Sequence, residues 1–274
     1  MNNLRRELAP ISSAAWEEID AEAKRVLKLK LAARKLVDFV GPLGLEASAV
    51  GLGRQEALKA GPVAGVGGWR RRVQPLVELR ADFSLSRAEM DDVERGSKDP
   101  ELAPLIEAAS RIALAEDSSV FNGYPAGGIQ GIKEASPHPK LTISNDYERY
   151  PQTVAEAARL LRIAGVGGPF CIALGPRCFA GLTQATERGG YPVIELVRRV
   201  LDGPIVWAPA VDGAVVMSVE SGDFELTVGQ DLAIGYASHT DSEVRLYLTE
   251  TMTFRVLKPE AAVALVYAQA GKGK

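Results

Sequence analysis

The sequence predicts an α+β fold in which a discontinuous unit encloses a smaller, inserted one. Apolar and polar residues alternate over residues 73–85 and again over 244–256, which indicates two long, half-buried strands. These strands lie more than 150 residues apart, so the unit that contains them is discontinuous. Between them, from about residue 150 to 219, short apolar runs alternate with helical patterns, as is typical of a compact α/β unit.

The first element is a helix, predicted over residues 13–40. Apolar residues recur there at three- and four-residue steps, and charged residues occupy the other face. The pattern stops at Gly41-Pro42, a pair that breaks helices. Eight glycines and few charges follow from Gly41 to Gly68, a composition that cannot build a core of its own. We therefore expect an extended, flexible arm that returns into the first long strand.

An acidic stretch, EMDDVERGSKDPEL (residues 89–102), follows that strand. Paired carboxylates could serve there as a catalytic acid and base, or as ligands of a hard cation. The alternative is a joint between two helices, which we favour. A short helix would run through Glu94 and stop at Gly96, and Asp99 would cap a long helix with Pro100 in its first turn.

The long helix is predicted over residues 100–120, with one apolar face. Glu116 lies on that face, and Glu250 interrupts the apolar face of the second long strand. A carboxylate in such a place needs a buried partner, because an unpaired charge is costly away from water. The sequence therefore predicts a partner for each of these glutamates without identifying it.

The composition excludes several classes of protein. The chain has 274 residues, 46% of them apolar and 24% charged, which is typical of a soluble globular protein. A formal net charge of −3 argues against a general nucleic-acid binder. The two cysteines, Cys171 and Cys178, are too few for a disulfide framework and favour a reducing cytoplasm. Neither an export signal nor a membrane-spanning run is visible, so no membrane partner is expected.

Motifs that would carry chemistry are weak. His138 and His239 stand in turn-like settings without a triad or metal motif, so both are predicted to be surface histidines. The glycine-rich pieces AGVGGW and AGGIQGIK lack the strand–loop–helix setting of a phosphate loop. WRRR, residues 69–72, offers an aromatic ring beside three cations, as nucleic-acid grooves do, but we favour a strand start or a subunit contact. No cofactor and no metal are predicted.

Five blocks of sequence, in order from Asn2 to about Val266, carry a family resemblance: NLRRELAPISSAAWEEID, RKLVDFVGPLG, PLVELRADFSLSRAEMDDVERGSKDPEL, GQDLAIGYASH and VRLYLTETMTF. They resemble the shell proteins of encapsulins, formerly called linocin-type bacteriocins, and most closely the actinobacterial type. The resemblance implies the α+β fold of tailed-phage major capsid proteins. Its implied parts are an N-terminal helix that starts the peripheral domain (1–43), an extension loop (44–74), a peripheral segment with the spine helix (75–135), an axial domain (136–222) and C-terminal peripheral strands (223–274).

This resemblance implies assembly and no catalysis. About 60 identical copies would close into a hollow icosahedral shell in the cytoplasm, and cargo enzymes would dock inside it through C-terminal peptides. The implied cargo is a dye-decolourising peroxidase, or a ferritin-like protein. By resemblance, the peptide groove lies between the N-terminal helix and a peripheral strand, at Arg34, Asp38, Val40, Leu232, Ile234 and Tyr236. Apolar side chains would accept Leu or Ile anchors of the peptide, while Arg34 and Asp38 would hold its polar groups.

The resemblance also implies an opening at the five-fold axis, in the loop TERGGYP (residues 186–192). The pore residues would be Glu187, Arg188, Gly189, Gly190 and Tyr191. Some relatives bind flavin on a tryptophan where this chain has Ala88, so a flavin is not expected here.

Two other functions stay open on the sequence alone. The same fold would suit a phage-derived major capsid protein that packages nucleic acid, although no nucleic-acid partner is expected. The acidic stretch would suit a hydrolase that uses Asp91 and Asp92.

Overall fold

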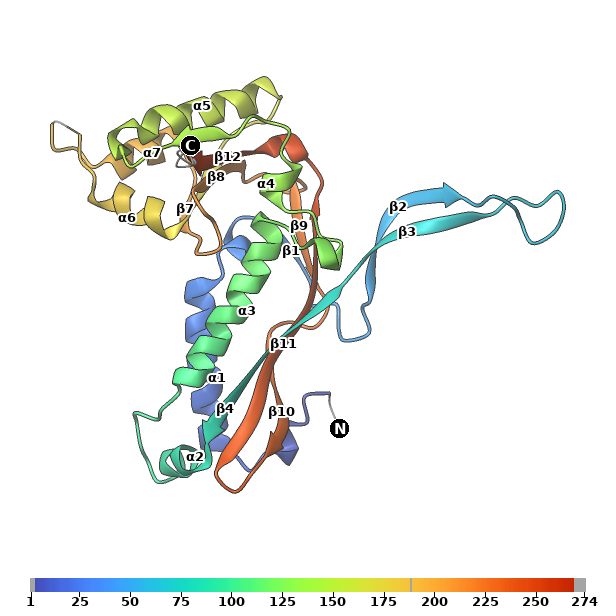
Figure 1. Ribbon diagram of the computed structural model, residues 1–274, viewed down its shortest axis with the longest axis vertical. Coiled ribbons are helices and arrows are strands. Elements are labelled where there is room, and N and C mark those ends of the chain that lie inside the picture. The colour runs from blue at the N-terminus through green and yellow to red at the C-terminus, as the bar shows by residue number, and fades with distance from the viewer. Residues whose placement is uncertain (1–2, 188, 269–274) are drawn as a thin grey trace, which may run out of the picture.

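The computed structural model describes residues 3–187 and 189–268 and shows an elongated body with a projecting arm (Figure 1). The helices are α1 Ser13–Lys30, α2 Arg87–Glu94, α3 Ala103–Phe121, α4 Ile132–Ala135, α5 Tyr150–Ile163, α6 Pro176–Gln184 and α7 Val193–Leu201. The strands are β1 Asp38–Val40, β2 Ala49–Ala57, β3 Trp69–Pro75, β4 Val77–Ser86, β5 Leu141–Ile143, β6 Phe170–Leu174, β7 Ile205–Trp207, β8 Ala214–Ser218, β9 Phe224–Val228, β10 Ala233–His239, β11 Glu243–Val256 and β12 Ala262–Tyr267.

The first sheet is built on β11. Its order is β1-β9-β11-β10, and β4 also pairs with β11. The β4–β11 ladder is antiparallel and runs from Ser86 opposite Glu243 to Val77 opposite Met252. The two long strands that the sequence predicts are therefore confirmed as partners. The first of them divides after Pro75, because β3 leaves the sheet and enters the arm.

Helices α1 and α3 cover one face of this sheet (Figure 1). Ser12 is the N-cap of α1, because its Oγ accepts a hydrogen bond from the N–H of Ala15. The prediction that this helix reaches residue 40 is wrong, because α1 ends at Lys30. The carboxylate of Asp117 on α3 accepts the N–H groups of both Ala32 and Ala33 at 2.9 Å, which redirects the chain after the helix. Residues Asp38–Val40 then join β9 as a parallel strand.

The long helix begins later than predicted. Helix α3 starts at Ala103, after a buried Leu102, and Pro104 stands in its first turn. Asp99 is not its cap, because the N–H of Ala103 is accepted by the carboxylate of Glu101 at 2.8 Å. The predicted apolar face is buried as expected, including Leu105, Ala109, Ile112 and Ala113. The acidic stretch is confirmed as a joint, with α2 ending at Glu94 and Gly96 following at a φ of 101°.

The second sheet has the order β5-β12-β8-β6-β7, and α5, α6 and α7 pack around it (Figure 1). The elements predicted for residues 150–219 are confirmed in kind and order. The family resemblance implies peripheral strands over residues 223–274, but within this range strand β12 enters the second sheet, where it lies between β5 and β8. Its residues Ala262 to Leu265 are buried without alternation, as in a strand covered on both faces.

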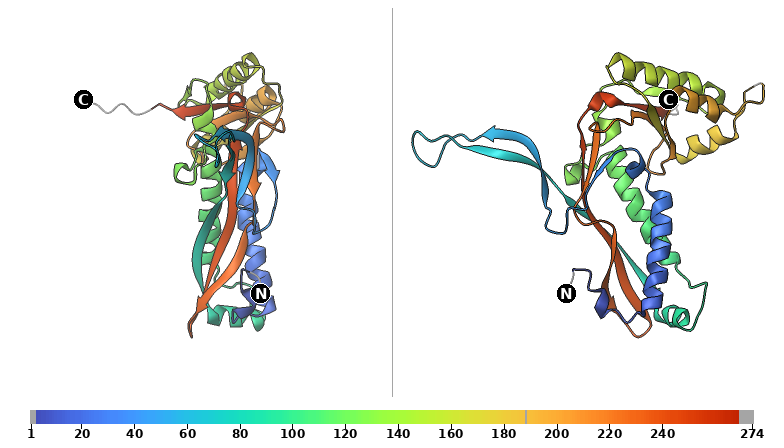
Figure 2. Two further views of the ribbon diagram at one scale, coloured as in Figure 1. Left: turned by 90° about the vertical axis from the view of Figure 1, so that its right-hand side faces the viewer. Right: turned by 180° about the vertical axis from the view of Figure 1, so that it is seen from behind.

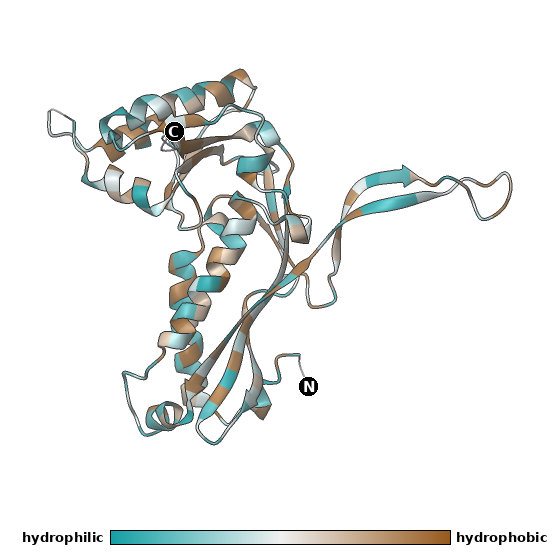
Figure 3. Cartoon of the chain, in the orientation of Figure 1, coloured by the Kyte–Doolittle hydropathy of each residue, from teal (hydrophilic) through white to brown (hydrophobic). Residues whose placement is uncertain are grey.

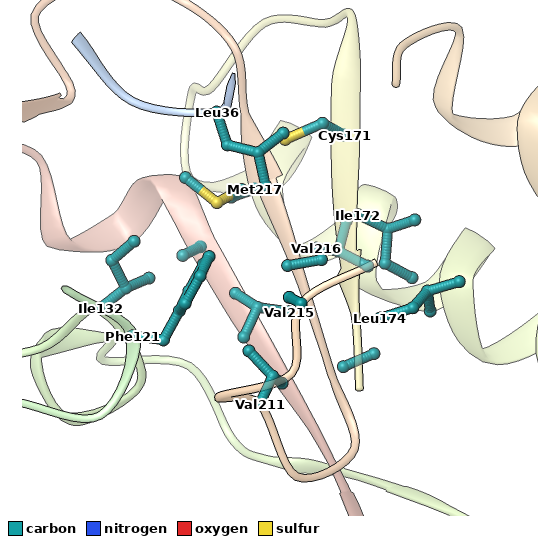
Figure 4. Close-up of a cluster of buried hydrophobic side chains, with 14 of the residues drawn as sticks. Leu36, Phe121, Ile132, Cys171, Ile172, Leu174, Val211, Val215, Val216 and Met217 are labelled. Atoms are coloured by element: carbon teal, nitrogen blue, oxygen red, sulfur yellow. The ribbon is translucent and has the colours of Figure 1, made fainter. Parts of the chain in front are cut away.

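The two units share one hydrophobic core. Leu36, from the segment after α1, packs near Met217, and Phe121, at the end of α3, packs near Val215 (Figure 4). Met217 and Val215 belong to β8 of the second sheet, whereas Phe254 of β11 lies in the same cluster. The units are therefore fixed against each other by buried contacts, and not only joined by the chain.

The glycine-rich stretch forms an arm that leaves the body (Figure 2). It is a two-stranded antiparallel hairpin of β2 and β3, with Glu56 opposite Arg70. Nearly all of its residues are exposed, and apolar side chains gather towards its tip, where Val63, Val66 and Trp69 are 53–67% exposed (Figure 3). The predicted extended arm is confirmed. A bare two-stranded ribbon is marginally stable in water, so this one needs a further surface to rest on.

One arginine supplies the partner of both buried glutamates. Arg34 follows α1, and its Nε donates to Glu116 at 2.8 Å while one terminal nitrogen donates to Glu250 at 3.0 Å. The other terminal nitrogen donates to Asp231 at 2.8 Å. Glu116 and Glu250 are fully buried, so the two partners predicted from the sequence exist and are the same residue.

The charges of this cluster do not balance if every group ionises, since one cation faces three carboxylates. Burial raises the pKa of Glu250 well above its usual range, and the negative Glu116 raises it further. Burial alone would lower the pKa of Arg34, but the hydrogen bond and charge of Glu116 hold it above its usual range. Glu250 therefore keeps its proton to higher pH than an exposed glutamate, while Arg34 stays charged.

We predict that Arg34→Met lowers the free energy of unfolding by about 3–5 kcal/mol, because it leaves buried carboxylates without a cation. Glu250→Gln is the matched control. Since the raised pKa of Glu250 shows that its site favours a neutral side chain, this change should cost no more than about 1 kcal/mol. Guanidinium unfolding at one protein concentration measures both variants. Equal losses in the two variants would contradict a site that favours the neutral form of Glu250.

Because the pKa of the buried Asp117 is raised, we predict that the free energy of unfolding depends on pH. Burial raises its pKa to about 7, although the N–H groups of Ala33 and Ala32 act in the opposite direction. A carboxyl that binds its proton more tightly in the folded chain releases it on unfolding. The free energy of unfolding therefore falls as pH rises from about 4 to 7, by at most about 1.4 kcal/mol per pH unit for one proton. Asp117→Asn should flatten this slope in thermal unfolding at a series of pH values, and an unchanged slope would exclude Asp117 as its source.

Candidate functional site: a groove between α1 and β10

A groove of about 500 Å³ lies between helix α1 and strand β10. Its floor is apolar and its rim is charged. The floor consists of Ala23, Leu27, Leu31, Leu232, Ile234 and Leu248, and the rim consists of Arg6, Asp20, Lys24, Lys28, Arg34 and Asp231. An apolar channel with polar edges suits an extended or helical peptide that carries spaced apolar anchors.

The rim charges are partly used within the chain. Arg6 pairs with Asp20 at 2.7 Å, and its guanidinium lies 3.9 Å from the centre of the Trp16 ring. Arg34 is held by its three carboxylates. Among the described residues, no ion pair includes Lys24 or Lys28. The charges that remain available to a ligand are therefore cationic and lie on the α1 side of the groove.

The structure brings together three of the six residues predicted for cargo binding. Arg34, Leu232 and Ile234 line the groove, although Ile234 is nearly fully buried and also belongs to the core beneath it. Sequence reasoning missed Leu27 and Leu31, which continue the apolar face of α1 at helical spacing. That periodicity was the signal that could have found them.

The other three predicted residues lie outside this groove. The carboxylate of Asp38 accepts the N–H of Gly222, so it is occupied at the start of β1. Tyr236 bonds His239 through its hydroxyl, and its backbone N–H donates to Leu4. Val40 is 37% exposed.

An apolar surface continues beyond Arg34, towards Val40. The Phe39 ring centre lies 5.0 Å from the Arg34 guanidinium, and Phe39 is 38% exposed. Val40, next in the chain, has a similar exposure. A ligand that filled the groove could therefore extend past Arg34 onto β1.

The loop of residues 186–192 joins α6 to α7 and projects from the second unit (Figure 1). Thr186 and Pro192 close it as an isolated bridge, and the N–H of Glu187 donates to Tyr191 at 2.9 Å. Gly190 has a φ of 79°, which favours glycine, and its N–H donates back to Glu187. Arg188 lies outside the described residues. The loop is thus a narrow turn, and Glu187, the residue at which this turn begins, is exposed.

The acidic stretch does not assemble a reactive site. Asp91 is exposed, and Asp92 pairs with Arg95 in the same helix. Within the described residues, no group of three or more His, Cys, Asp or Glu side chains is placed to hold a metal ion. Ala88 is exposed at the start of α2 and offers no ring for a flavin to stack on. Among the described helices, none has the length and apolar character to cross a membrane.

Comparisons with known proteins give the family. A family model described as "Encapsulating protein for peroxidase" matches residues 1–253. The type 1 encapsulin shell protein of Rhodospirillum rubrum is 52% identical over 97% of this chain and 96% of its own length. The type 1 encapsulin shell protein of Mycobacterium tuberculosis is 47% identical over 97% of this chain and 99% of its own length. A diheme-cytochrome-encapsulin shell fusion protein of Kuenenia stuttgartiensis is 25% identical over 93% of this chain and 73% of its own.

Two solved structures show the fold. The virus-like particle from Pyrococcus furiosus superposes with a TM-score of 0.64 at 18% identity, covering 90% of this chain and 98% of that one. The capsid of Myoviridae phage XM1 superposes with a TM-score of 0.53 at 10% identity, covering 85% of this chain and 90% of that one. The predicted α+β capsid fold is confirmed. The relatives are structural shell proteins and not enzymes, so the hydrolase interpretation of Asp91 and Asp92 is wrong. The chain belongs to the encapsulin shell protein family.

Proposed function

We propose that about 60 copies of this chain close into a hollow icosahedral shell in the cytoplasm. The family match and the capsid fold support this proposal. So does the arm, since beyond its root it leaves the body with nearly every side chain exposed. A neighbouring copy supplies a surface for the arm in a closed assembly.

The shell takes up cargo enzymes through their C-terminal peptides, which lie in the groove between α1 and β10. The observation that carries this proposal is the apolar floor of Leu27, Leu31 and Leu232 beneath a charged rim. Leu or Ile side chains of a peptide bury apolar area there, while Lys24 and Lys28 meet its carboxylate groups. Several weak sites act together when an oligomeric cargo engages them at once.

The cargo is a dye-decolourising peroxidase, or a ferritin-like protein. The description of the family, an encapsulating protein for peroxidase, favours the first. Fusion of a diheme cytochrome to a shell protein in one relative supports the wider idea of an enclosed redox protein. Of the predicted peptide contacts, Arg34, Leu232 and Ile234 act at the groove, and Asp38, Val40 and Tyr236 extend the surface.

Small substrates enter at the loop of residues 186–192, which lines an opening at the five-fold axis. Its narrow turn and the exposed Glu187 support this role. Five copies of a carboxylate around one axis would repel anions and attract cations.

Purification of the native protein tests the shell and its cargo together. We expect uniform hollow particles of megadalton mass in electron microscopy, and an enclosed enzyme in mass spectrometry. Leu232→Asp places a charge on the groove floor. It should lower the amount of enzyme enclosed per particle at least about tenfold, with the particle yield unchanged. Ile163→Asp, an exposed position on α5, is the matched control. A stable monomer would exclude the shell, and undiminished cargo in Leu232→Asp would exclude the groove.

Charge reversal at the loop tests the pore. Glu187→Lys should raise turnover of an anionic substrate by the enclosed enzyme several-fold relative to a cationic one, because the substitution makes each copy more positive by two charges at the opening. The same enzyme released from the shell is the control and should show no change. Equal rates for wild-type and variant shells would place the entry route elsewhere.

A further inference from the structure

The arm carries positive charge that it does not neutralise itself. Residues 49–75 contain five basic side chains and one acidic one, in a chain whose formal net charge is −3. The acidic one, Glu56, already pairs with Arg70 at 2.9 Å. Within residues 3–187 and 189–268, no ion pair includes Arg54, Arg71 or Arg72. Three exposed guanidinium groups therefore remain available on a hairpin that extends away from the body.

Arg54 and Arg72 line a cavity on the surface of the molecule. A space of about 630 Å³ lies at the root of the arm, where Arg54 and Arg72 face the end of β11. Gln74 fixes this root by donating to the carbonyl of Gly128 at 2.8 Å. Arg255, on the far wall, is already occupied by Glu225. The cavity is thus preformed and polar, and its uncompensated charge comes from Arg54 and Arg72.

We propose that this cavity receives the acidic end of a second copy of the chain, through Asp91 and Glu94 of its helix α2. Residues 87–101 hold six acidic side chains and three basic ones. Asp91 and Glu94 are exposed, form no ion pair among the described residues, and lie three positions apart on one helical face. The proposal rests on the proposed shell, and it identifies which surface of the neighbour the root of the arm meets.

The two surfaces cannot meet within one copy. Helix α2 lies at one end of the elongated body, and the arm leaves the body and points away from it (Figures 1 and 2). Two arms would repel each other, because each has the same excess of arginine. A basic surface that meets a different, acidic surface makes a head-to-tail contact. Contacts of that kind close into rings when the rotation between copies allows it, as a shell requires.

Nucleic acid is the competing occupant, since arginines beside Trp69 could also bind a phosphate backbone. The negative charge of the whole chain disfavours it. The charge reversal described next distinguishes nucleic acid from the acidic helix as the occupant.

A charge swap tests the contact. Arg54→Glu with Arg72→Glu should reduce the particle fraction at least tenfold in analytical ultracentrifugation, at unchanged protein concentration. Adding Asp91→Arg and Glu94→Arg to the same chain should restore it to within twofold of wild type. The same reversal at Arg159 and Arg162 on α5 is the control for net charge. Circular dichroism of each variant separates misfolding from loss of assembly.

A crosslink tests the geometry without disturbing the charge balance of the whole arm. Arg54→Cys combined with Glu94→Cys should form disulfides between copies in assembled particles, since Cys171 and Cys178 are both buried. A head-to-tail contact gives a ladder of dimers, trimers and higher multimers in a denaturing gel. Arg54→Cys combined with Glu148→Cys, another exposed acidic position, is the control and should remain monomeric.

The outcomes separate this proposal from the shell itself. If the wild-type chain forms no particles, the proposed function fails. If particles form but survive reversal of Arg54 and Arg72, or if the swap fails to restore them and no ladder appears, only this contact is overturned. If reversal leaves the particles intact but removes co-purified nucleic acid, measured by the ratio of absorbance at 260 and 280 nm, the arm binds nucleic acid instead.

Discussion

The fold depends on one guanidinium group that faces three carboxylates. Arg34 lies just after α1 and reaches Glu116 on α3 and Glu250 on β11, and its third partner, Asp231, precedes β10. These segments are distant in sequence, and no apolar contact alone would fix their mutual orientation so closely. A buried ionic cluster of this kind contributes little net stability, but it strongly disfavours any arrangement that leaves one of its charges unpaired. The same arginine forms one end of the peptide groove, so the groove inherits its shape from the core.

Rigid elements and a shared hydrophobic core explain how one chain can present several separate surfaces. The groove, the loop of residues 186–192 and the arm lie on different parts of the elongated body. Each is positioned by a rigid element: the groove by α1 and the first sheet, the loop by α6 and α7, and the arm by the continuation of β4 into β3. The shared core at Leu36 and Phe121 keeps these parts in a constant relation. A closed shell requires such constancy, because small errors of angle accumulate around a ring.

Sequence patterns located most of the fold and only part of the groove. Alternation predicted β4 and β11, and the two glutamates on apolar faces indicated buried partners, because periodicity and burial are local properties. The sequence could not show that α1 ends at Lys30, since the helix is redirected by Asp117, a residue far away in the chain. The sequence could not place β12 for a similar reason, because an all-apolar run does not say which sheet it enters. Leu27 and Leu31 were missed as groove residues because their spacing reveals an apolar face of α1 but not the strand that lies across from it.

The place of β12 has a consequence for how a subunit is made. This strand lies between β5 and β8, although both of them precede it in the chain. Strands β4 and β11 are likewise separated by more than 150 residues, so neither sheet can be completed before its C-terminal strand has been synthesised. Until then a nascent chain has an unpaired central position in its second sheet and lacks the rigid frame that fixes its arm. Each sheet therefore reaches its complete strand order only after β11 and β12 have been synthesised, and the arm gains its rigid base at the same step.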